Sequence, residues 1–261
     1  MSIAAADAGA RLGFPRVHLR STDSTNERAR ELARAGAPHG TLVTASEQSA
    51  GRGRQGRRWS APPDSSLLMS LLLRSPPRLL PLMAAVAVCE VADEHASIKW
   101  PNDIVVGLAG DAAAPLAKLA KLAKLAGILI EGRPQEGWAV LGIGLNVAVR
   151  LEDLPAELRA NADGTYSGQG LPAATMGAAP SEIEPTLTRL LQALGHRLAQ
   201  EPAETLEAWR ERDALKGREV AWSGGRGRAQ GIDGEGRLVV ALAQGGHTAI
   251  GSGEVHLERI S

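Results

Sequence analysis

The sequence predicts an α+β fold, in which a mixed sheet flanked by helices precedes a small all-β unit. Over residues 1–215, apolar runs of strand length alternate with segments of helical periodicity. From residue 216 onward, short alternating strands are separated by glycine-containing turns. We therefore expect a domain over residues 1–215 and a second domain over residues 216–261 that forms a small β-barrel.

In the first part, Ser24 and Glu27 have the S-x-x-E spacing of a capping box, and Gly36 suits the end of the helix that follows. A second, apolar helix is expected over residues 79–95. Apolar runs bounded by turn residues predict the strands. The expected strands are residues 41–47, 66–73, 98–100, 104–106, 125–131 and 138–149.

Residues 161–180 are rich in glycine, proline and alanine and predict a loop. Ser181 and Glu184 form a second capping-box pattern, before a helix expected to reach about Gln200. Pro202 suits the first turn of a further helix that ends near Asp213. The tail is expected to contain strands at 218–222, 228–232, 237–242 and 247–250, with a hairpin turn at 233–236.

Composition excludes several classes of protein. The chain has 261 residues, a formal net charge of zero, 44% hydrophobic and 22% charged residues. Balanced charge argues against a non-specific nucleic-acid binder. The single Cys89 excludes an internal disulfide and a cysteine zinc site. The longest apolar run is too short for a membrane helix, and the first residues lack a secretory signal. We expect a soluble, intracellular protein.

Gly51–Gly56 matches the dinucleotide fingerprint G-x-G-x-x-G, but its context does not. That fingerprint requires a helix to begin at its last glycine, whereas Pro62 and Pro63 follow too soon here. The segment has anion-binding character instead, since guanidinium groups suit phosphate or carboxylate. Its arginines are Arg52, Arg54, Arg57 and Arg58. A solvated basic loop is the alternative on these residues alone.

Only five of the 29 basic residues are lysines. Lys99 ends an expected strand, before a turn that presents Asn102 and Asp103. Lysine is a compact counter-charge for phosphate, and this Asn-Asp pair suits a hydroxyl or a magnesium ion. Lys124 begins another strand, with Gly127 permitting close approach of a ligand. The sequence contains no histidine pair with metal-ligand spacing, no Walker loop and no G-x-S-x-G motif.

These motifs, in this order, resemble those of the biotin protein ligases. The resemblance covers residues 17–149, and the tail from residue 217 is similar in character only. It rests on Ser21–Asn26, Gln48, Ala50–Trp59, Lys99–Asp103, Lys124–Leu129 and Gly142–Asn146. It implies a catalytic domain like that of class II synthetases, followed by an SH3-like barrel.

The resemblance further implies a two-step reaction. Biotin attacks the α-phosphate of ATP with Mg²⁺ present, and biotinyl-5′-AMP then biotinylates a lysine of the biotin carboxyl carrier protein of acetyl-CoA carboxylase or a related carboxylase. It also implies a cytoplasmic protein and a possible homodimer. About 16 residues precede the catalytic region, too few for the helix-turn-helix domain of some members, so we expect no DNA binding. The short apolar runs lead us to expect no membrane association either.

The resemblance also assigns roles to individual residues. The residues expected to be catalytic are Lys124 and Arg54. Those expected to bind biotin are Ser24, Thr25, Asn26, Gln48, Arg52, Gly53, Arg54, Lys124 and Gly127. Those expected to bind ATP are Trp59, Lys99, Asn102, Asp103 and Asn146. The residues that hold the metal are left open.

One departure is the threefold Lys-Leu-Ala repeat at residues 118–126, which we interpret as a small duplication. Lys124 is chosen over Lys118 and Lys121 because only Lys124 keeps its spacing to Gly127. Two other functions stay open: a lipoate or octanoate ligase or transferase of the same fold, and a biotin-binding regulatory protein without catalysis.

Overall fold

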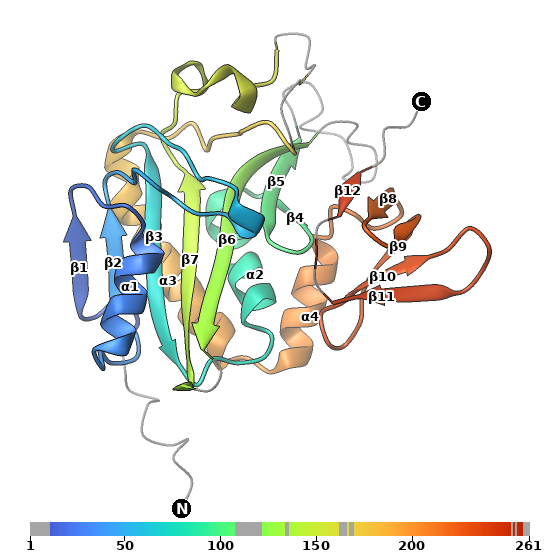
Figure 1. Cartoon of the computed structure of the whole chain (residues 1–261), viewed down its shortest axis with the longest axis horizontal. Helices are drawn as coiled ribbons and strands as arrows, with labels where there is room; N and C mark the ends of the chain where they lie inside the picture. The colour runs from blue at the N-terminus through green and yellow to red at the C-terminus, as the bar shows by residue number, and fades with distance from the viewer. Residues whose placement is uncertain are drawn as a thin grey trace, which may run out of the picture.

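A seven-stranded mixed sheet forms the centre of the molecule (Figure 1). The structure, a computed structural model, describes residues 11–107, 122–133, 136–161, 166, 170–251, 253 and 255–257. The sheet has the order β1-β2-β3-β7-β6-β5-β4, and only β1 and β2 pair in parallel. Its strands are β1 (Arg16–Leu19), β2 (Leu42–Ala45), β3 (Ser66–Arg74), β4 (Ser97–Lys99), β5 (Asp103–Gly107), β6 (Leu122–Arg133) and β7 (Trp138–Asn146).

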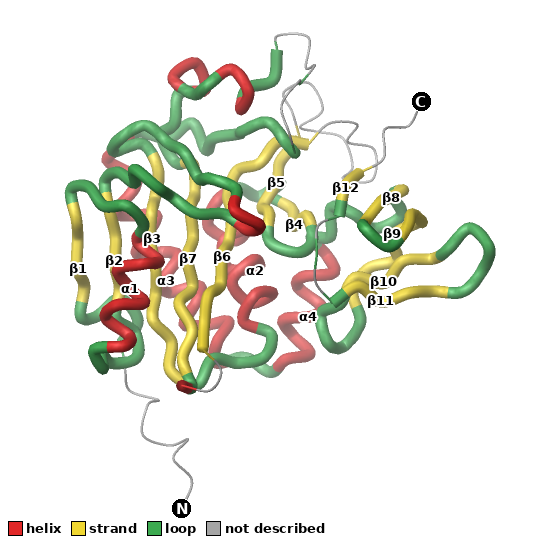
Figure 2. Tube along the Cα trace, viewed as in Figure 1, coloured by secondary structure: helices red, strands yellow, loops and turns green. Residues whose placement is uncertain are grey.

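Helices cover both faces of this sheet, as the tube in Figure 2 shows. One face carries α1 (Thr25–Arg34), whose Ala29 and Ala33 pack against Leu72 and Val140. The neighbouring side chains of β3 and β7 point the other way, because successive side chains of a strand alternate between faces. They join a larger core with α2 (Leu80–Ala92), α3 (Ile183–Ala199) and α4 (Pro202–Glu211).

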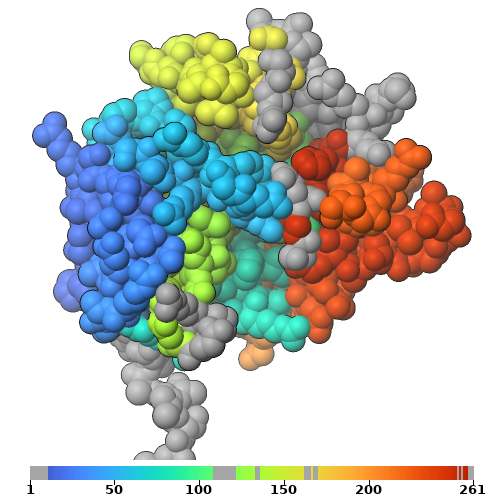
Figure 3. All heavy atoms as spheres, viewed as in Figure 1, coloured from blue at the N-terminus to red at the C-terminus, as the bar shows by residue number. Residues whose placement is uncertain are grey.

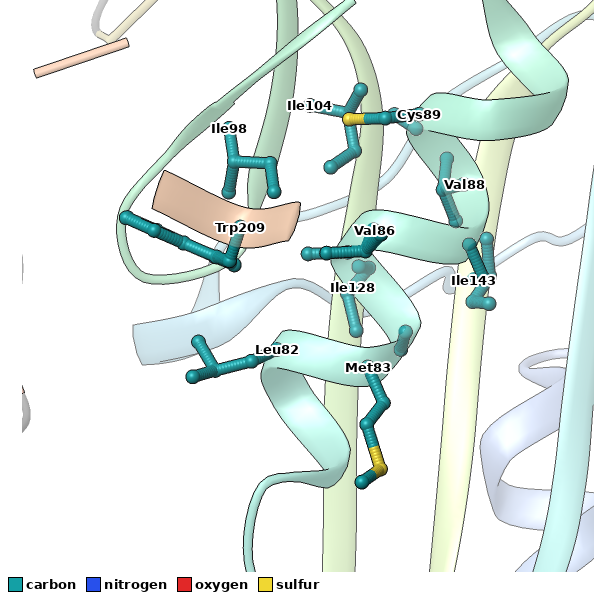
Figure 4. Close-up of a cluster of buried hydrophobic side chains, with 14 of the residues drawn as sticks. Leu82, Met83, Val86, Val88, Cys89, Ile98, Ile104, Ile128, Ile143 and Trp209 are labelled. Carbon is teal, nitrogen blue, oxygen red and sulfur yellow. The ribbon is translucent and has the colours of Figure 1, made fainter. Parts of the chain in front are cut away.

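Helix α2 is apolar on nearly all sides because other elements surround it. It contacts α3, α4 and the strands β4, β5 and β6. Figure 4 shows Trp209 of α4 and Ile98 on one side of this helix and Ile143 of β7 on the other. The lone Cys89 is buried here, and burial raises the pKa of its thiol to about 12. Cys89 is therefore a packing residue, as its apolar context predicts.

The tail forms an open sheet, so the expected closed barrel is wrong for the described residues. Its order is β11-β10-β9-β8-β12, and the two end strands do not pair with each other in the part of the chain that is described. The turn at residues 233–236 joins two antiparallel strands, as predicted. The strands are β8 (Glu219–Trp222), β9 (Gly225–Ile232), β10 (Leu238–Ala241), β11 (His247–Ile250) and β12 (His256–Leu257).

The two predicted capping boxes are also wrong. Neither Ser24 nor Ser181 caps a helix through its side chain: α1 has Ser24 at its N-cap without a side-chain bond, and α3 has Glu182 there. The sequence also did not predict β1 or β12, which are short and lie at sheet edges, where one neighbouring strand suffices. The other predicted elements are present, with ends that differ by a few residues. In the described part of the chain, no helix is long and apolar enough to span a membrane.

Candidate functional site

A cavity of about 280 Å³ opens on the face of the sheet that carries α1. The sheet surface beneath the cavity carries no side chains at Gly142 and Gly144 of β7, and Gly144 pairs with Gly127 of β6. These glycines form the floor of the cavity. A Cβ on Gly144 would lie 2.6 Å from the Trp59 ring. Glycine at these positions therefore leaves room for an indole and a ligand above the sheet.

The cavity brings together every residue that the sequence predicted for the site. These are Ser24, Thr25, Asn26, Gln48, Arg52, Gly53, Arg54, Trp59, Lys99, Asn102, Asp103, Lys124, Gly127 and Asn146. They come from the start of α1, the loop after β2, the β4–β5 turn and the inner strands. Lys118 and Lys121 lie outside the described residues, so the choice of Lys124 within the repeat stays a prediction.

One end of the cavity is neutral and rich in hydrogen-bonding groups. Gln48 Oε1 accepts from the backbone N–H of Thr25 at 2.7 Å. Ser70 Oγ lies 2.8 Å from Thr25 Oγ1 and donates to Asn26 Oδ1 at 2.6 Å. At the start of α1, the carboxylate of Asp23 accepts from the N–H of Ser24, and Ser24 lines the cavity without making a side-chain cap bond.

The other end is cationic. Lys124 Nζ lies 2.6 Å from Asp103 Oδ1 and 5.6 Å from the centre of the Trp59 ring. Lys99 is only 8% exposed and donates to the carbonyl of Val255 at 2.8 Å. Because β12 lies beside β8 in the tail sheet, this contact brings the C-terminal sheet to the cavity.

The arginine-rich loop covers the cavity and folds back on itself. The N–H of Gly53 donates to the carbonyl of Arg57 at 2.7 Å, and Arg52 bridges to Arg58 in antiparallel fashion. No helix begins after Gly56, which agrees with the rejection of a dinucleotide fingerprint. Figure 3 shows this loop spreading over the middle of the visible face toward the C-terminal sheet.

Contacts of the loop arginines fix it over the cavity. Arg54 donates to Asn102 Oδ1 at 3.4 Å and to the carbonyl of Gly253 at 3.2 Å. Arg52 forms an ion pair with Glu27 of α1 at 3.2 Å. The loop is thus attached to α1, to the β4–β5 turn and to the tail at once.

Sequence reasoning missed several residues of the site. Glu131 accepts a hydrogen bond from Asn26 Nδ2 at 2.8 Å, and a charged residue in an otherwise apolar strand is the signal that would have found it. Ser70 lies buried in β3 and had no local signal. His256 and Leu257 line the cavity from β12, a strand that the sequence did not predict.

Family models match two parts of the chain. The model of the "Biotin/lipoate A/B protein ligase family" matches residues 18–147, and that of the "Biotin protein ligase C terminal domain" matches residues 217–257. Both matches follow the division between the central sheet and the tail sheet.

Named relatives give the same result. The biotin–[acetyl-CoA-carboxylase] ligase of Mycobacterium tuberculosis is 31% identical over 251 residues, which are 88% of this chain and 83% of that protein. The bifunctional ligase/repressor BirA of Bacillus subtilis is 39% identical over 148 residues, 52% of this chain, and the match spans only 41% of that relative.

A solved structure shows the fold. The biotin protein ligase from Aquifex aeolicus in complex with biotin and ATP superposes with a TM-score of 0.69 at 24% identity, over 94% of this chain and 98% of that one. Together with the match along most of the M. tuberculosis enzyme, these similarities show that the chain belongs to the biotin protein ligase family.

Proposed function

We propose that this chain activates biotin with ATP to biotinyl-5′-AMP and transfers the biotinyl group to a lysine of a biotin carboxyl carrier protein. The observation that carries this proposal is the polarity of the cavity. Among its described lining residues, cations far outnumber acids, and the neutral hydrogen-bonding side chains of Thr25 and Gln48 lie together. The cations are Arg52, Arg54, Arg57, Arg58, Lys99 and Lys124, and the acid is Asp103. A ligand pair with a neutral ring, a carboxylate and a triphosphate fits this division.

In the first step a biotin carboxylate oxygen bonds to the α-phosphorus of ATP, and the bond to the bridging oxygen breaks, which releases pyrophosphate. Both reactants are anions and repel each other in water. Lys124 and Arg54 would hold them together and stabilise the charge that develops at phosphorus. Lys124 suits this role because its ammonium lies beside Gly127 at the floor, where a Cβ would lie 3.1 Å from Nζ.

In the second step the amine of the carrier lysine attacks the acyl carbon of the anhydride, and AMP leaves. Water competes for the same carbon, so the intermediate needs shielding. The loop of residues 51–58 provides a cover, since Arg54 links it to the tail and Arg52 links it to α1. For the nucleotide, Trp59, Lys99, Asn102 and Asn146 are proposed as contacts, as the resemblance implies.

The residues also fit a magnesium ion that arrives on the triphosphate. Mg²⁺ typically takes one or two carboxylates and completes its shell with phosphate oxygens and water. Asp103 is the one carboxylate among the described lining residues, and Asn102 lies next to it. Because both residues line the cavity, Asp103 and Asn102 are the residues that would hold the ion.

Three finer statements belong to the same proposal. The chain is proposed to act in the cytoplasm, as a homodimer and without a DNA partner. The residues from 216 onward are proposed as a domain separate from residues 1–215. The acceptor is proposed to be the carrier domain of acetyl-CoA carboxylase or a related carboxylase.

The test mixes the purified protein with labelled biotin, ATP, Mg²⁺ and a carrier domain. We expect label on the carrier, release of one pyrophosphate per transfer, and no label on a carrier whose acceptor lysine is replaced by arginine. Lipoate and octanoate in place of biotin test the related transferases. Biotin binding without label transfer would identify a regulatory protein instead and would refute the enzyme.

A further inference from the structure

His256 lies at the mouth of the cavity, on the side of the C-terminal sheet. It is on β12, where it pairs with Ala221 of β8, and it both lines the cavity and is exposed to solvent. Val255 before it is buried in the apolar core, and Leu257 after it packs against that core. Because successive side chains of a strand alternate between faces, the imidazole of His256 points away from the core.

Two cations of the cavity hold the backbone next to His256. Lys99 Nζ donates to the carbonyl of Val255 at 2.8 Å, and Arg54 donates to the carbonyl of Gly253 at 3.2 Å. A carbonyl oxygen lies about 3 Å from the Cα atom of the next residue, so the Cα of His256 is within about 6 Å of the Lys99 ammonium. His256 is therefore anchored beside the cationic side chains of the cavity.

The transfer of an acyl group to a lysine needs a proton acceptor. The lysine nitrogen becomes positively charged as it bonds to the acyl carbon, and this charge is unfavourable near the cations Lys99 and Arg54. A base that takes a proton from the nitrogen during the attack lowers this barrier.

Once the cationic lysines are set aside, the described lining residues offer two general bases, Asp103 and His256. Asp103 is only 7% exposed, and its Oδ1 lies 2.6 Å from Lys124 Nζ. A carboxylate that is paired with an ammonium is a weak base. Histidine is the side chain that most often serves as a general base near neutral pH, and an incoming side chain can reach the exposed His256.

We propose that His256 is a catalytic residue of the transfer step, in which it acts as the general base. This inference rests on the proposed function. The arriving lysine ammonium first loses one proton to water. As its nitrogen bonds to the acyl carbon, one of the two remaining protons passes to the imidazole, and the bond between that carbon and the phosphate oxygen breaks. AMP leaves with the electron pair of that bond, and the imidazolium gives its proton to water.

The test measures the two steps separately. Single-turnover pyrophosphate release without carrier reports adenylate formation, and mixing carrier with enzyme that already holds biotinyl-5′-AMP reports transfer. His256→Ala is expected to lower the transfer rate by about 10²-fold, the scale of general-base catalysis, and to leave the rate of adenylate formation within about twofold of wild type. His256→Gln keeps hydrogen-bonding groups but accepts no proton, so its transfer is expected to be as slow.

Two further measurements separate a base from a structural residue. Imidazole added to the buffer is expected to restore part of the transfer rate of His256→Ala and to leave the wild-type rate unchanged, because it replaces the missing base. His247→Ala is the matched control, since His247 is an exposed histidine of β11 that is not among the lining residues of the cavity. It is expected to change neither rate.

Each outcome decides between the two proposals. Wild type that forms no adenylate from biotin and ATP contradicts the proposed function itself. Equal losses in the two rates, or rapid transfer by His256→Gln, would show that His256 is not the base. A transfer defect that imidazole does not relieve points to a structural role and overturns the inference as well. If His256→Ala does not fold, the same rates of His256→Gln, which keeps a polar side chain of similar length, decide the question.

Discussion

At the scale of single residues, the two lysines of the cavity have different surroundings. Lys124 contacts the carboxylate of Asp103 and the face of Trp59, so its charge lies between an acid and an aromatic ring. Lys99 is buried, and its ammonium reaches the backbone of the C-terminal strand at Val255. Both places use a compact ammonium, a point charge with three donors, although arginine dominates the basic residues of this chain.

The lysine repeat yields a prediction for three matched variants. Lys124→Ala is expected to lower the rate of adenylate formation by about 10²- to 10³-fold, because one preorganised charge at the reacting phosphate is lost. The rates of adenylate formation by Lys118→Ala and Lys121→Ala are expected to stay within about twofold of the wild-type rate. Single-turnover pyrophosphate release measures all three. Similar losses in the three variants would show that the repeat uses another register.

At the scale of elements, strand β7 makes room for the ligand through its glycines. Gly142 and Gly144 point to the same side, where Asn26 and the Trp59 ring take the space of absent side chains. The opposite side of the strand is packed with large apolar residues such as Leu141 and Ile143. One strand therefore supports the core on one face and leaves the cavity open on the other.

Gly144→Ala tests this use of β7. Its Cβ would lie 2.6 Å from Trp59 Cε2, so the indole must move off the floor of the cavity. We expect an overpacking cost of about 1–3 kcal/mol in the free energy of unfolding and a higher KM for ATP. Urea unfolding and initial rates measure the two effects. Gly234→Ala, with no atom within 4 Å of its added Cβ, is the control and is expected to change neither.

At the scale of the whole molecule, the tail sheet is joined to the central sheet through buried groups. Val220, Ala229 and Leu238 of the tail belong to the same apolar cluster as α2. Asp213 lies at this junction, where its backbone bridges to Ile98 of β4. Asp213 Oδ1 accepts from the N–H of Leu215 at 2.8 Å, whereas Oδ2 is buried without a hydrogen bond. Burial raises the pKa of Asp213 to about 6.

This junction predicts a dependence of stability on pH. A carboxyl whose pKa is higher in the folded state stabilises the fold below its unfolded pKa, and this stabilisation is lost as the pH rises through about 6. The loss between about pH 4 and pH 7 is of the order of 3 kcal/mol. Asp213→Asn retains an acceptor for the N–H of Leu215. We expect its free energy of unfolding to change less with pH than that of wild type between pH 5 and 7.5, and to be higher than that of wild type at pH 7.5.

Urea unfolding of wild type and Asp213→Asn at pH 5, 6 and 7.5 measures this difference. Parallel profiles of the two proteins would show that the Asp213 carboxyl does not titrate in this range. Both proteins are expected to lose folding stability as the pH falls below 4. This loss comes partly from Asp23, whose pKa the Arg28 guanidinium and the Ser24 N–H lower to about 2.

Local patterns predicted much of the fold because they depend on neighbours in the chain. The period of apolar residues predicted α1, α3 and all the inner strands of the sheet, and Pro202 marked the first turn of α4. Neither predicted capping box forms: Ser24 lines the cavity and makes no side-chain cap bond, and Glu182, not Ser181, is the N-cap residue of α3. The prediction of a barrel was wrong because closure depends on which strand the last strand pairs with, and the spacing of turns along the sequence does not determine that pairing.

The sequence by itself determined which cations, amides and glycines this protein places in its motifs, and every one of those predicted site residues lines one cavity. Only the tertiary structure decided what surrounds them. Glu131 meets Asn26 across 105 residues, and Val255 meets Lys99 across 156. Such contacts follow from strand register and from the packing of one sheet beside another, and neither leaves a periodic signal along the chain.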